Sequence, residues 1–145
     1  MSESAKIDFR CRRVADVEDI ADLADMLFPG NQNQVHAAAC ILCELKWAEN
    51  IVPRLSGLET RFGISRRTLQ RTRAKLARLG LIEHVSSLNA RYGGRSGWKL
   101  SNRFAGALRQ LADKVERWQD AKGPGRREKE EMLLEMCRPP GKPSL

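Results

Sequence analysis

Residues 58–82 read LETRFGISRRTLQRTRAKLARLGLI, a pattern that predicts two short helices joined by a tight turn. Gly63 separates two short helical patterns, and Ser65 is a typical N-cap for the second. We predict that this second helix runs from Ser65 to Leu79 and ends at Gly80. One of its faces is apolar at helical spacing, through Leu69, Thr72, Leu76 and Leu79. This face can pack on the first helix, through Leu58, Phe62 and Ile64, and so fix the angle between the two.

The opposite face of the second helix is strongly basic. It carries Arg66, Arg67, Gln70, Arg71, Arg73, Lys75 and Arg78, and no acidic residue lies between Ser65 and Leu79. If the helix enters a DNA major groove, its first turns bring Arg66, Arg67, Gln70 and Arg71 near base edges, where Arg suits guanine and Gln suits adenine. We expect Arg73, Lys75 and Arg78 to meet phosphate instead.

The sequence on either side predicts a helical chain with one β-hairpin. Upstream we expect an acidic amphipathic helix over 15–27, a buried helix over 32–49, an extended piece at 51–53 and a helix over 55–62. Downstream we expect strands at 81–85 and 97–100 around a glycine-rich turn, then a helix over 102–119 capped by Ser101 and a possible short helix over 127–137. The segments would be 1–30 as arm and acidic helix, 31–103 as central module, 104–121 as C-terminal helix and 122–145 as flexible tail.

Over about residues 32–103 this pattern resembles the winged helix-turn-helix family of bacterial DNA-binding regulators. The best match is the run 63–69, GISRRTL, followed by Leu76, Leu79, Gly80, Leu81 and Ile82. The resemblance implies a mainly α fold with a small β-hairpin wing and extra N- and C-terminal helices. It further implies that the serine-capped helix reads DNA through Ser65, Arg66, Arg67, Thr68, Gln70 and Arg71. The wing, with Arg91, Tyr92 and Arg95, would meet the minor groove or the backbone.

The positive charge of the chain is concentrated in this central module. The net charge is +8, but residues 51–103 hold twelve Lys or Arg against two acids, so this stretch carries +10 and the rest −2. A merely solubilising surface usually mixes both signs. The distribution therefore favours a polyanionic partner, and double-stranded DNA is the partner we expect.

Composition sets the broad class. Of 145 residues 41% are hydrophobic, and no apolar run approaches the roughly 18 residues that cross a bilayer. The polar, acidic N-terminus does not resemble a signal peptide. Four irregularly spaced cysteines suggest reduced thiols. We expect one domain with tails, located in the cytoplasm and without a membrane partner.

Two patterns contain residue types found in catalytic or metal sites, and both have simpler interpretations. Tyr92 could be a strand-cleaving nucleophile, but both histidines, His36 and His84, lie far from it in sequence. His36, Cys40 and Cys43 share a helical face and could hold a metal with Cys11 or Cys137, although a lone Cys-x-x-Cys in an apolar run more often fills a core. We therefore expect no catalysis, no metal and no cofactor.

The C-terminal helix carries a two-heptad apolar seam. Its members alternate by four and three: Phe104, Leu108, Leu111, Val115 and Trp118. Such a seam pairs helices, so a homodimer is expected, although the seam could also pack on its own domain. The acidic helix could add to this interface or dock a protein partner.

These observations predict a sequence-specific double-stranded DNA-binding protein that regulates transcription. A replication, partition or recombination accessory factor of a plasmid or phage remains an alternative, as does a protein-interaction adaptor with the same fold. Binding of RNA is a further alternative, although the few aromatic residues do not form a stacking platform.

Overall fold

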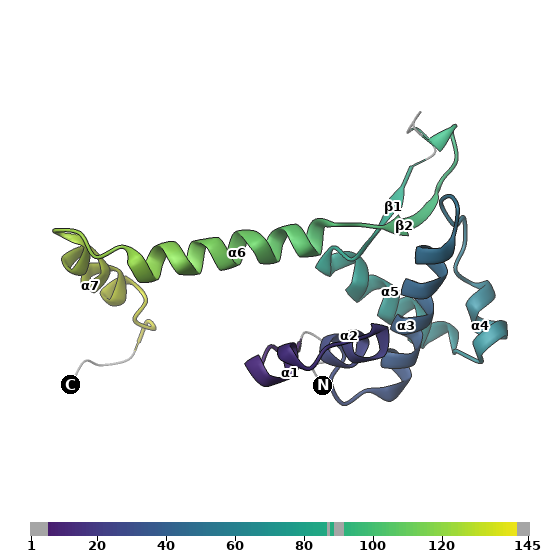
Figure 1. The fold of residues 1–145 in the computed structure, drawn as a ribbon, viewed down its shortest axis with the longest axis horizontal. Coiled ribbons are helices and arrows are strands. Elements are labelled where there is room, and N and C mark those ends of the chain that lie inside the picture. Colours follow the sequence, from purple (N-terminus) through teal and green to yellow (C-terminus); the bar gives the residue numbers. More distant parts are fainter. Residues whose placement is uncertain (1–5, 87, 89–91, 142–145) are drawn as a thin grey trace. The chain divides into compact units, whose positions relative to one another are not determined.

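The computed structural model describes residues 6–86, 88 and 92–141. Contacts within the chain divide it into two compact units, Met1–Gly106 and Ala107–Leu145. The described residues form a mainly helical protein with one small antiparallel sheet (Figure 1). The mainly α class with a β-hairpin, predicted from the sequence, is thereby confirmed.

The first unit contains most of the regular structure. In chain order it comprises α1 (Cys11–Ala15), α2 (Ile20–Leu27), α3 (Gln32–Trp47), α4 (Gly57–Phe62), α5 (Arg66–Leu79), β1 (Ile82–Val85), β2 (Gly97–Leu100) and the start of α6 (Arg103–Asp120). The helix predicted from its cap at Ser65 and the strand predicted at 97–100 are observed within one residue of their expected bounds. Residues 1–30 and 31–103, separate segments in the prediction, belong to this one unit.

The prediction of one acidic helix over 15–27 is wrong in its first part. The chain instead forms the short helix α1, leaves helical geometry over 16–19 and begins α2 at Ile20. The physical reason is the side chain of Asp19, which accepts a hydrogen bond from the backbone N–H of Asp22 at 2.9 Å and so caps a new helix. Asp19 therefore starts a helix rather than lying within one, while Asp22 and Asp25 lie along α2.

Helix α3 is the centre of the first unit. It packs against α2, α4, α5 and β2, while α5 also packs against β1. The largest fully buried side chains come from each of these elements except β2, with Phe28 directly after α2: Leu27, Phe28, Ile41, Leu58, Thr72, Leu76 and Ile82. The apolar face of α2 is part of this core, through Ala24, Met26 and Leu27. One face of α5 is therefore packed in the core, and its opposite face is exposed to solvent.

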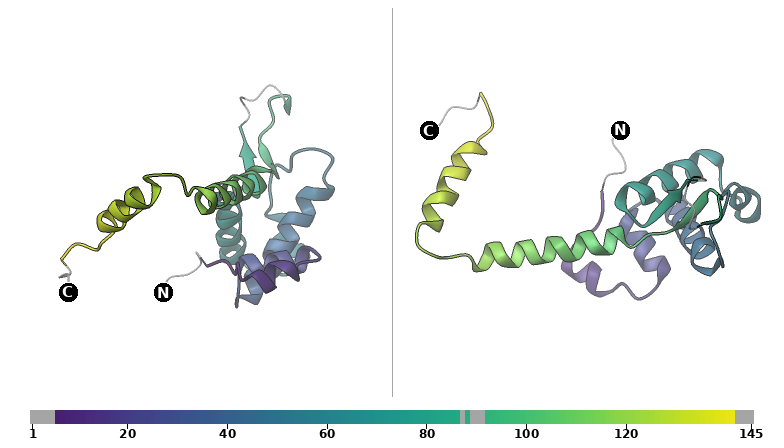
Figure 2. Two further views of the ribbon diagram at one scale, coloured as in Figure 1. Left: turned by 60° about the vertical axis from the view of Figure 1, so that its left-hand side comes forward. Right: turned by 90° about the horizontal axis from the view of Figure 1, so that it is seen from above.

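The hairpin is joined to the helical part by a third extended segment. In the β1–β2 pair Ile82 lies opposite Leu100 and Val85 opposite Gly97. Val52 bridges Trp98 with two backbone hydrogen bonds of 2.9 and 2.8 Å. Beyond this bridge the hairpin projects away from the helices of its unit (Figures 1 and 2).

Gly80 connects α5 to both the hairpin and α6. Its φ of +91° places it in the left-handed region that ends α5. Its carbonyl accepts a hydrogen bond of 2.9 Å from the N–H of Phe104, and a Cβ on Gly80 would lie 2.9 Å from the Cβ of Arg103. The tight contact requires a residue without a side chain at this position.

The second unit consists of α6 from Ala107 onward and α7 (Arg126–Met136). None of its described residues is buried. Ion pairs one turn apart, Arg117 with Asp113 and Arg127 with Glu131, lie along its helices. Across the described parts of both units, no helix has the combined length and apolarity that crossing a bilayer requires.

The Glu83 carboxylate contacts both the partner strand of the hairpin and the first residue of α6. Because these contacts need the ionised carboxylate, we predict that its contribution to stability is lost in acid. The carboxylate accepts a hydrogen bond of 3.1 Å from Lys99 and lies 3.5 Å from Arg103. The bond from Lys99 holds the pKa of Glu83 below its ordinary value of 4.5. Stability from this group is therefore present above pH 4.5 and is lost as the pH falls through the lower, folded-state pKa.

Glu83→Gln should lower the free energy of unfolding at pH 7 by about 0.5–1 kcal/mol, and the difference should vanish in acid. Urea unfolding at pH 7 and pH 3 measures it, with Glu49→Gln on an exposed carboxylate as control. An equal loss in the free energy of unfolding at both pH values would contradict the proposed role of the ionised Glu83 carboxylate.

Candidate nucleic-acid interface

Helix α5 is held at its first turn by a short, well-capped connection from α4. Gly63 adopts φ +66°, which lets the chain reverse between the two helices. The Ser65 hydroxyl accepts a hydrogen bond of 3.1 Å from the N–H of Thr68 and donates one of 2.9 Å to the Thr68 hydroxyl. Leu69 and Leu76 then anchor the helix in the core. The direction of α5 is thus set by its cap and its apolar face together.

The outer face of α5 is a stripe of exposed, mostly basic residues, here called the basic stripe. Its members are Arg66, Arg67, Gln70, Arg71, Ala74 and Arg78. At about 100° per residue, all but Arg66 fall within roughly 100° of arc around the helix axis, and Arg66 extends the stripe at one side. Among the described residues, no carboxylate lies within ion-pair distance of any of these guanidinium groups.

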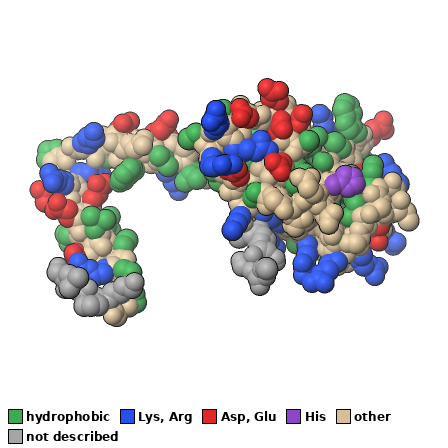
Figure 3. Space-filling model, turned by 90° about the horizontal axis from the view of Figure 1, so that it is seen from below, with side chains coloured by type: hydrophobic (Ala, Val, Ile, Leu, Met, Phe, Trp, Pro, Cys, Tyr) green, Lys and Arg blue, Asp and Glu red, His purple; other side chains and the backbone are tan. Residues whose placement is uncertain are grey.

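The charge of the first unit is unevenly distributed over its surface. In Figure 3, blue basic side chains predominate along the lower edge of this unit, whereas most of its red acidic side chains lie along the upper edge, together with further basic ones. Basic residues elsewhere in the unit pair with acids, as Arg61 does with Glu44, whereas the guanidinium groups of the basic stripe have no such partner among the described residues. An anionic surface can therefore neutralise them without first breaking internal ion pairs.

One edge of the basic stripe adjoins the hairpin. The guanidinium of Arg73 lies over the Trp98 ring, 5.0 Å from its centroid, and the His84 ring meets Trp98 edge-on at 5.0 Å. Arg73 is therefore only partly exposed, and its charge is engaged with the hairpin. These contacts help to set the orientation of the hairpin relative to α5.

The other edge adjoins the N-terminal segment, and here the sequence prediction fails. Lys75, expected at a phosphate, is buried with 5% of its surface exposed. Its ammonium donates hydrogen bonds to the carbonyl of Lys6 at 2.8 Å and to that of Leu27, and it lies 4.5 Å from the Phe28 ring. Burial lowers the pKa of Lys75, and Arg78 lowers it further. The Lys75 side chain therefore caps the C-terminus of α2 and does not face solvent.

Of the hairpin residues predicted at DNA, the two that the structure describes differ in exposure. Arg95 is exposed and its N–H donates to the carbonyl of Tyr92 at 3.2 Å, while Tyr92 itself is half-buried. Arg91 lies outside the described residues. The structure thus offers Arg95 as an accessible cation near the hairpin turn.

The N-terminus of α5 borders a small polar hollow of about 210 Å³. It is lined by Asn33, His36, Gly63, Ile64, Ser65 and Thr68. Ser65 and Thr68, both predicted to contact DNA, thus lie beside the start of the basic stripe, although their hydroxyls already bond to each other. Asn33 and His36 were not predicted here, because only the fold brings α3 to this end of α5.

Two further residues of this surface were not predicted from the sequence. Ala74 lies in the middle of the basic stripe and is exposed. Its spacing of seven from Arg67 and three from Arg71 is the signal that could have found it. Trp98 was placed only as part of a strand, and its opposition to His84 could have been inferred from the hairpin register.

The predicted seam on the C-terminal helix divides between the two units. Phe104 belongs to the first unit, where it packs against the core, so it is not available for pairing as predicted. Leu108, Leu111, Val115 and Trp118 belong to the second unit and are all exposed. Only the latter four form an accessible seam.

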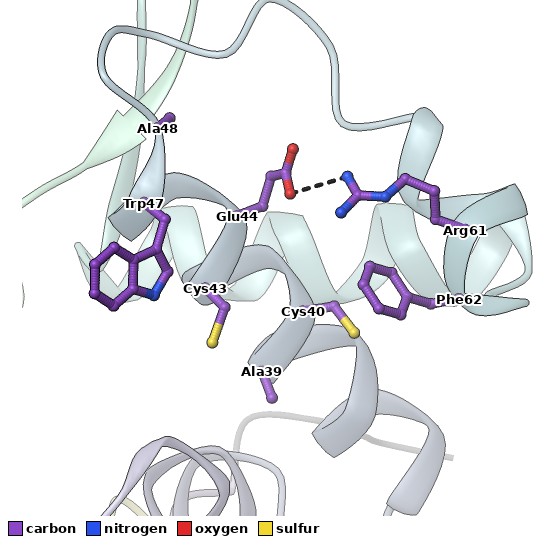
Figure 4. Close-up of a pocket in the computed structure, with 8 residues that line it drawn as sticks. All are labelled: Ala39, Cys40, Cys43, Glu44, Trp47, Ala48, Arg61 and Phe62. Carbon is purple, nitrogen blue, oxygen red and sulfur yellow. Dashed lines mark hydrogen bonds and ion pairs between the residues drawn. The ribbon is translucent and has the colours of Figure 1, made fainter.

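The two central cysteines lie in an apolar groove of about 500 Å³ on the outside of α3. Figure 4 shows Cys40 and Cys43 between Trp47 and Phe62, with Arg61 paired to Glu44 at 3.0 Å across the rim. Burial raises the pKa of Cys40, and Cys43 raises it further, which disfavours the reactive thiolate. Among the described residues, no cluster of three or more Cys, His, Asp or Glu side chains is placed to hold a metal ion.

Comparison with known proteins gives no assignment, since no family model, curated protein or solved structure matches this chain significantly.

The buried position of Lys75 predicts a loss of stability on its removal. Lys75→Ala should lower the free energy of unfolding by about 2–3 kcal/mol, because it leaves two carbonyls without a donor and opens a cavity. Urea unfolding followed by tryptophan fluorescence measures it. Arg78→Ala, one turn along on the exposed side, is the control and should cost less than about 0.5 kcal/mol. Equal effects of the two substitutions would contradict the structural role.

Proposed function

We propose that this protein binds double-stranded DNA through the basic stripe of α5, as a winged helix-turn-helix whose wing is the β1–β2 hairpin. The observation that carries the proposal is the stripe itself, an exposed row of guanidinium groups for which the described part of the chain provides no counter-charge, on a helix whose other face is packed in the core. A helix of this size fits the major groove.

Different residues of this surface would contact different parts of the DNA. Arg67, Gln70 and Arg71 lie on the first turns and would contact base edges, since Arg suits guanine and Gln suits adenine. Ala74 is small, so it allows the helix to approach closely, and its methyl group suits the methyl group of thymine. Arg78 would meet phosphate, and the hairpin would follow the backbone through Arg95.

The biological consequence we infer is regulation of transcription in the cytoplasm by occupancy of a site, without catalysis. The alternative of an accessory factor in replication or recombination uses the same surface. The two differ in their targets, because an accessory factor covers an array of repeated sites whereas a regulator covers one or two sites near a promoter.

Selection from a random duplex pool, at low and at physiological salt, tests the proposal. We expect an enriched motif, and binding that weakens steeply with salt because counterions are released from the phosphates. Binding without a motif would indicate an architectural role. Failure to bind duplex DNA at either salt concentration would refute the proposal and favour the adaptor alternative.

A further inference from the structure

The seam on α6 presents large apolar side chains to solvent. Leu111 and Trp118 expose 58% and 63% of their surfaces, and Leu108 and Val115 expose 36% and 44%. All four lie on one stripe of the helix, because their positions differ by three or four residues. A contiguous apolar stripe of this kind marks an interaction surface.

The residues around the stripe fit a second copy of the same helix. Small side chains, Ala107 and Ala112, border it, so another helix can approach closely. The charged residues lie away from the stripe, except for Lys114 at one side: Arg109, Asp113, Glu116, Arg117 and Asp120. Arg117 and Asp113 already pair with each other on that outer side. Two such stripes face each other without burying an unpaired carboxylate or guanidinium.

The area of the seam sets how strong this pairing can be. The four side chains expose roughly 400 Å² of apolar surface per copy, about half of the ~800 Å² per partner in a stable interface. Two heptads therefore suffice for a weak, reversible contact and fall short of a permanent dimer.

We infer that two copies of this protein pair through Leu108, Leu111, Val115 and Trp118, weakly in solution and effectively when both occupy neighbouring DNA sites. On adjacent sites the second copy is held at an effective concentration near the millimolar range, which compensates for the small seam. The part that concerns DNA rests on the proposed function, whereas the pairing of the helices does not.

The first test uses the full chain without DNA. Sedimentation equilibrium should show a monomer at about 10 µM and a reversible dimer approaching the millimolar range. Leu111→Glu should abolish the dimer, whereas Gln110→Glu adds the same charge away from the stripe and should leave it intact. Circular dichroism verifies that both variants retain their helices. A monomer at all concentrations, a tight dimer at nanomolar concentration, or a dimer insensitive to Leu111→Glu would overturn the inference.

The second test measures affinity for duplexes that carry one or two copies of the selected site. Two sites should bind the protein with about 10-fold cooperativity. Leu111→Glu should remove this cooperativity and leave the affinity for a single site within about 2-fold. Cooperativity that persists in the variant would overturn the coupling to DNA. Absence of all binding would count against the proposed function alone, since the sedimentation result stands independently.

Discussion

Replacing Arg67 and Arg71 together by alanine should weaken binding of the selected DNA site by about 100- to 1000-fold. Each Arg that reaches a guanine contributes about 1–3 kcal/mol of discrimination, and the two lie one turn apart on the same exposed stripe. Titration of fluorescent duplex at fixed salt measures the loss. The preference at the corresponding bases should also relax, because the groups that read them are gone.

The matched control removes two exposed charges from the second unit. Arg109→Ala with Arg126→Ala changes the net charge equally and should alter the affinity by less than about 5-fold. Both variants should unfold at the same urea concentration as the parent, since none of the four side chains is buried. Similar losses in both double variants would show that binding depends on total charge and would contradict a specific role for α5.

Gly97→Ala should lower the free energy of unfolding by about 3 kcal/mol or more. A Cβ at this position would lie 2.6 Å from the carbonyl oxygen of Val52 and 3.1 Å from the Cα of Pro53, and both atoms are backbone. The clash must separate the strands and break the two hydrogen bonds between Val52 and Trp98. Chemical unfolding measures the loss, and hydrogen exchange at the N–H groups of Val52 and Trp98 locates it.

Gly57→Ala provides the internal comparison for that prediction. Gly57 begins α4, and a Cβ there meets nothing within 4 Å. Alanine favours a helix over glycine, so this variant should be more stable than the parent by a few tenths to 1 kcal/mol. If Gly97→Ala did not lower the free energy of unfolding either, the backbone of Val52 could not lie as close to Gly97 as described.

Local signals predicted the elements that form the candidate interface. Ser65 and Gly80 marked the ends of α5, and the spacing from Leu69 to Leu76 identified its buried face. The remaining positions of the helix could therefore be predicted to be exposed. Strand β2 was found because Gly97 follows a glycine-rich turn. These features depend on neighbours within one or two turns, which is the range over which a sequence pattern carries structural information.

The features that were missed depend on contacts between distant residues. Lys75 was counted among the exposed cations because its helical position borders both faces, and only the approach of Lys6 and Leu27 shows that it points inward. Phe104 continued the seam in sequence, yet its backbone bond to Gly80 keeps it in the first unit. The break before α2 depended on Asp19, whose capping role competes with its place in an amphipathic pattern.

The separation of buried and exposed positions on α5 has a consequence for how this protein can change. Arg67, Gln70, Arg71 and Ala74 contribute nothing to the core, so substitutions there should leave folding almost untouched. New target preferences can therefore arise by single steps without a compensating stabilising mutation elsewhere. A library randomised at these four codons would retain a high fraction of folded members, so under the proposed function the protein would be a practical starting scaffold for altered DNA specificity.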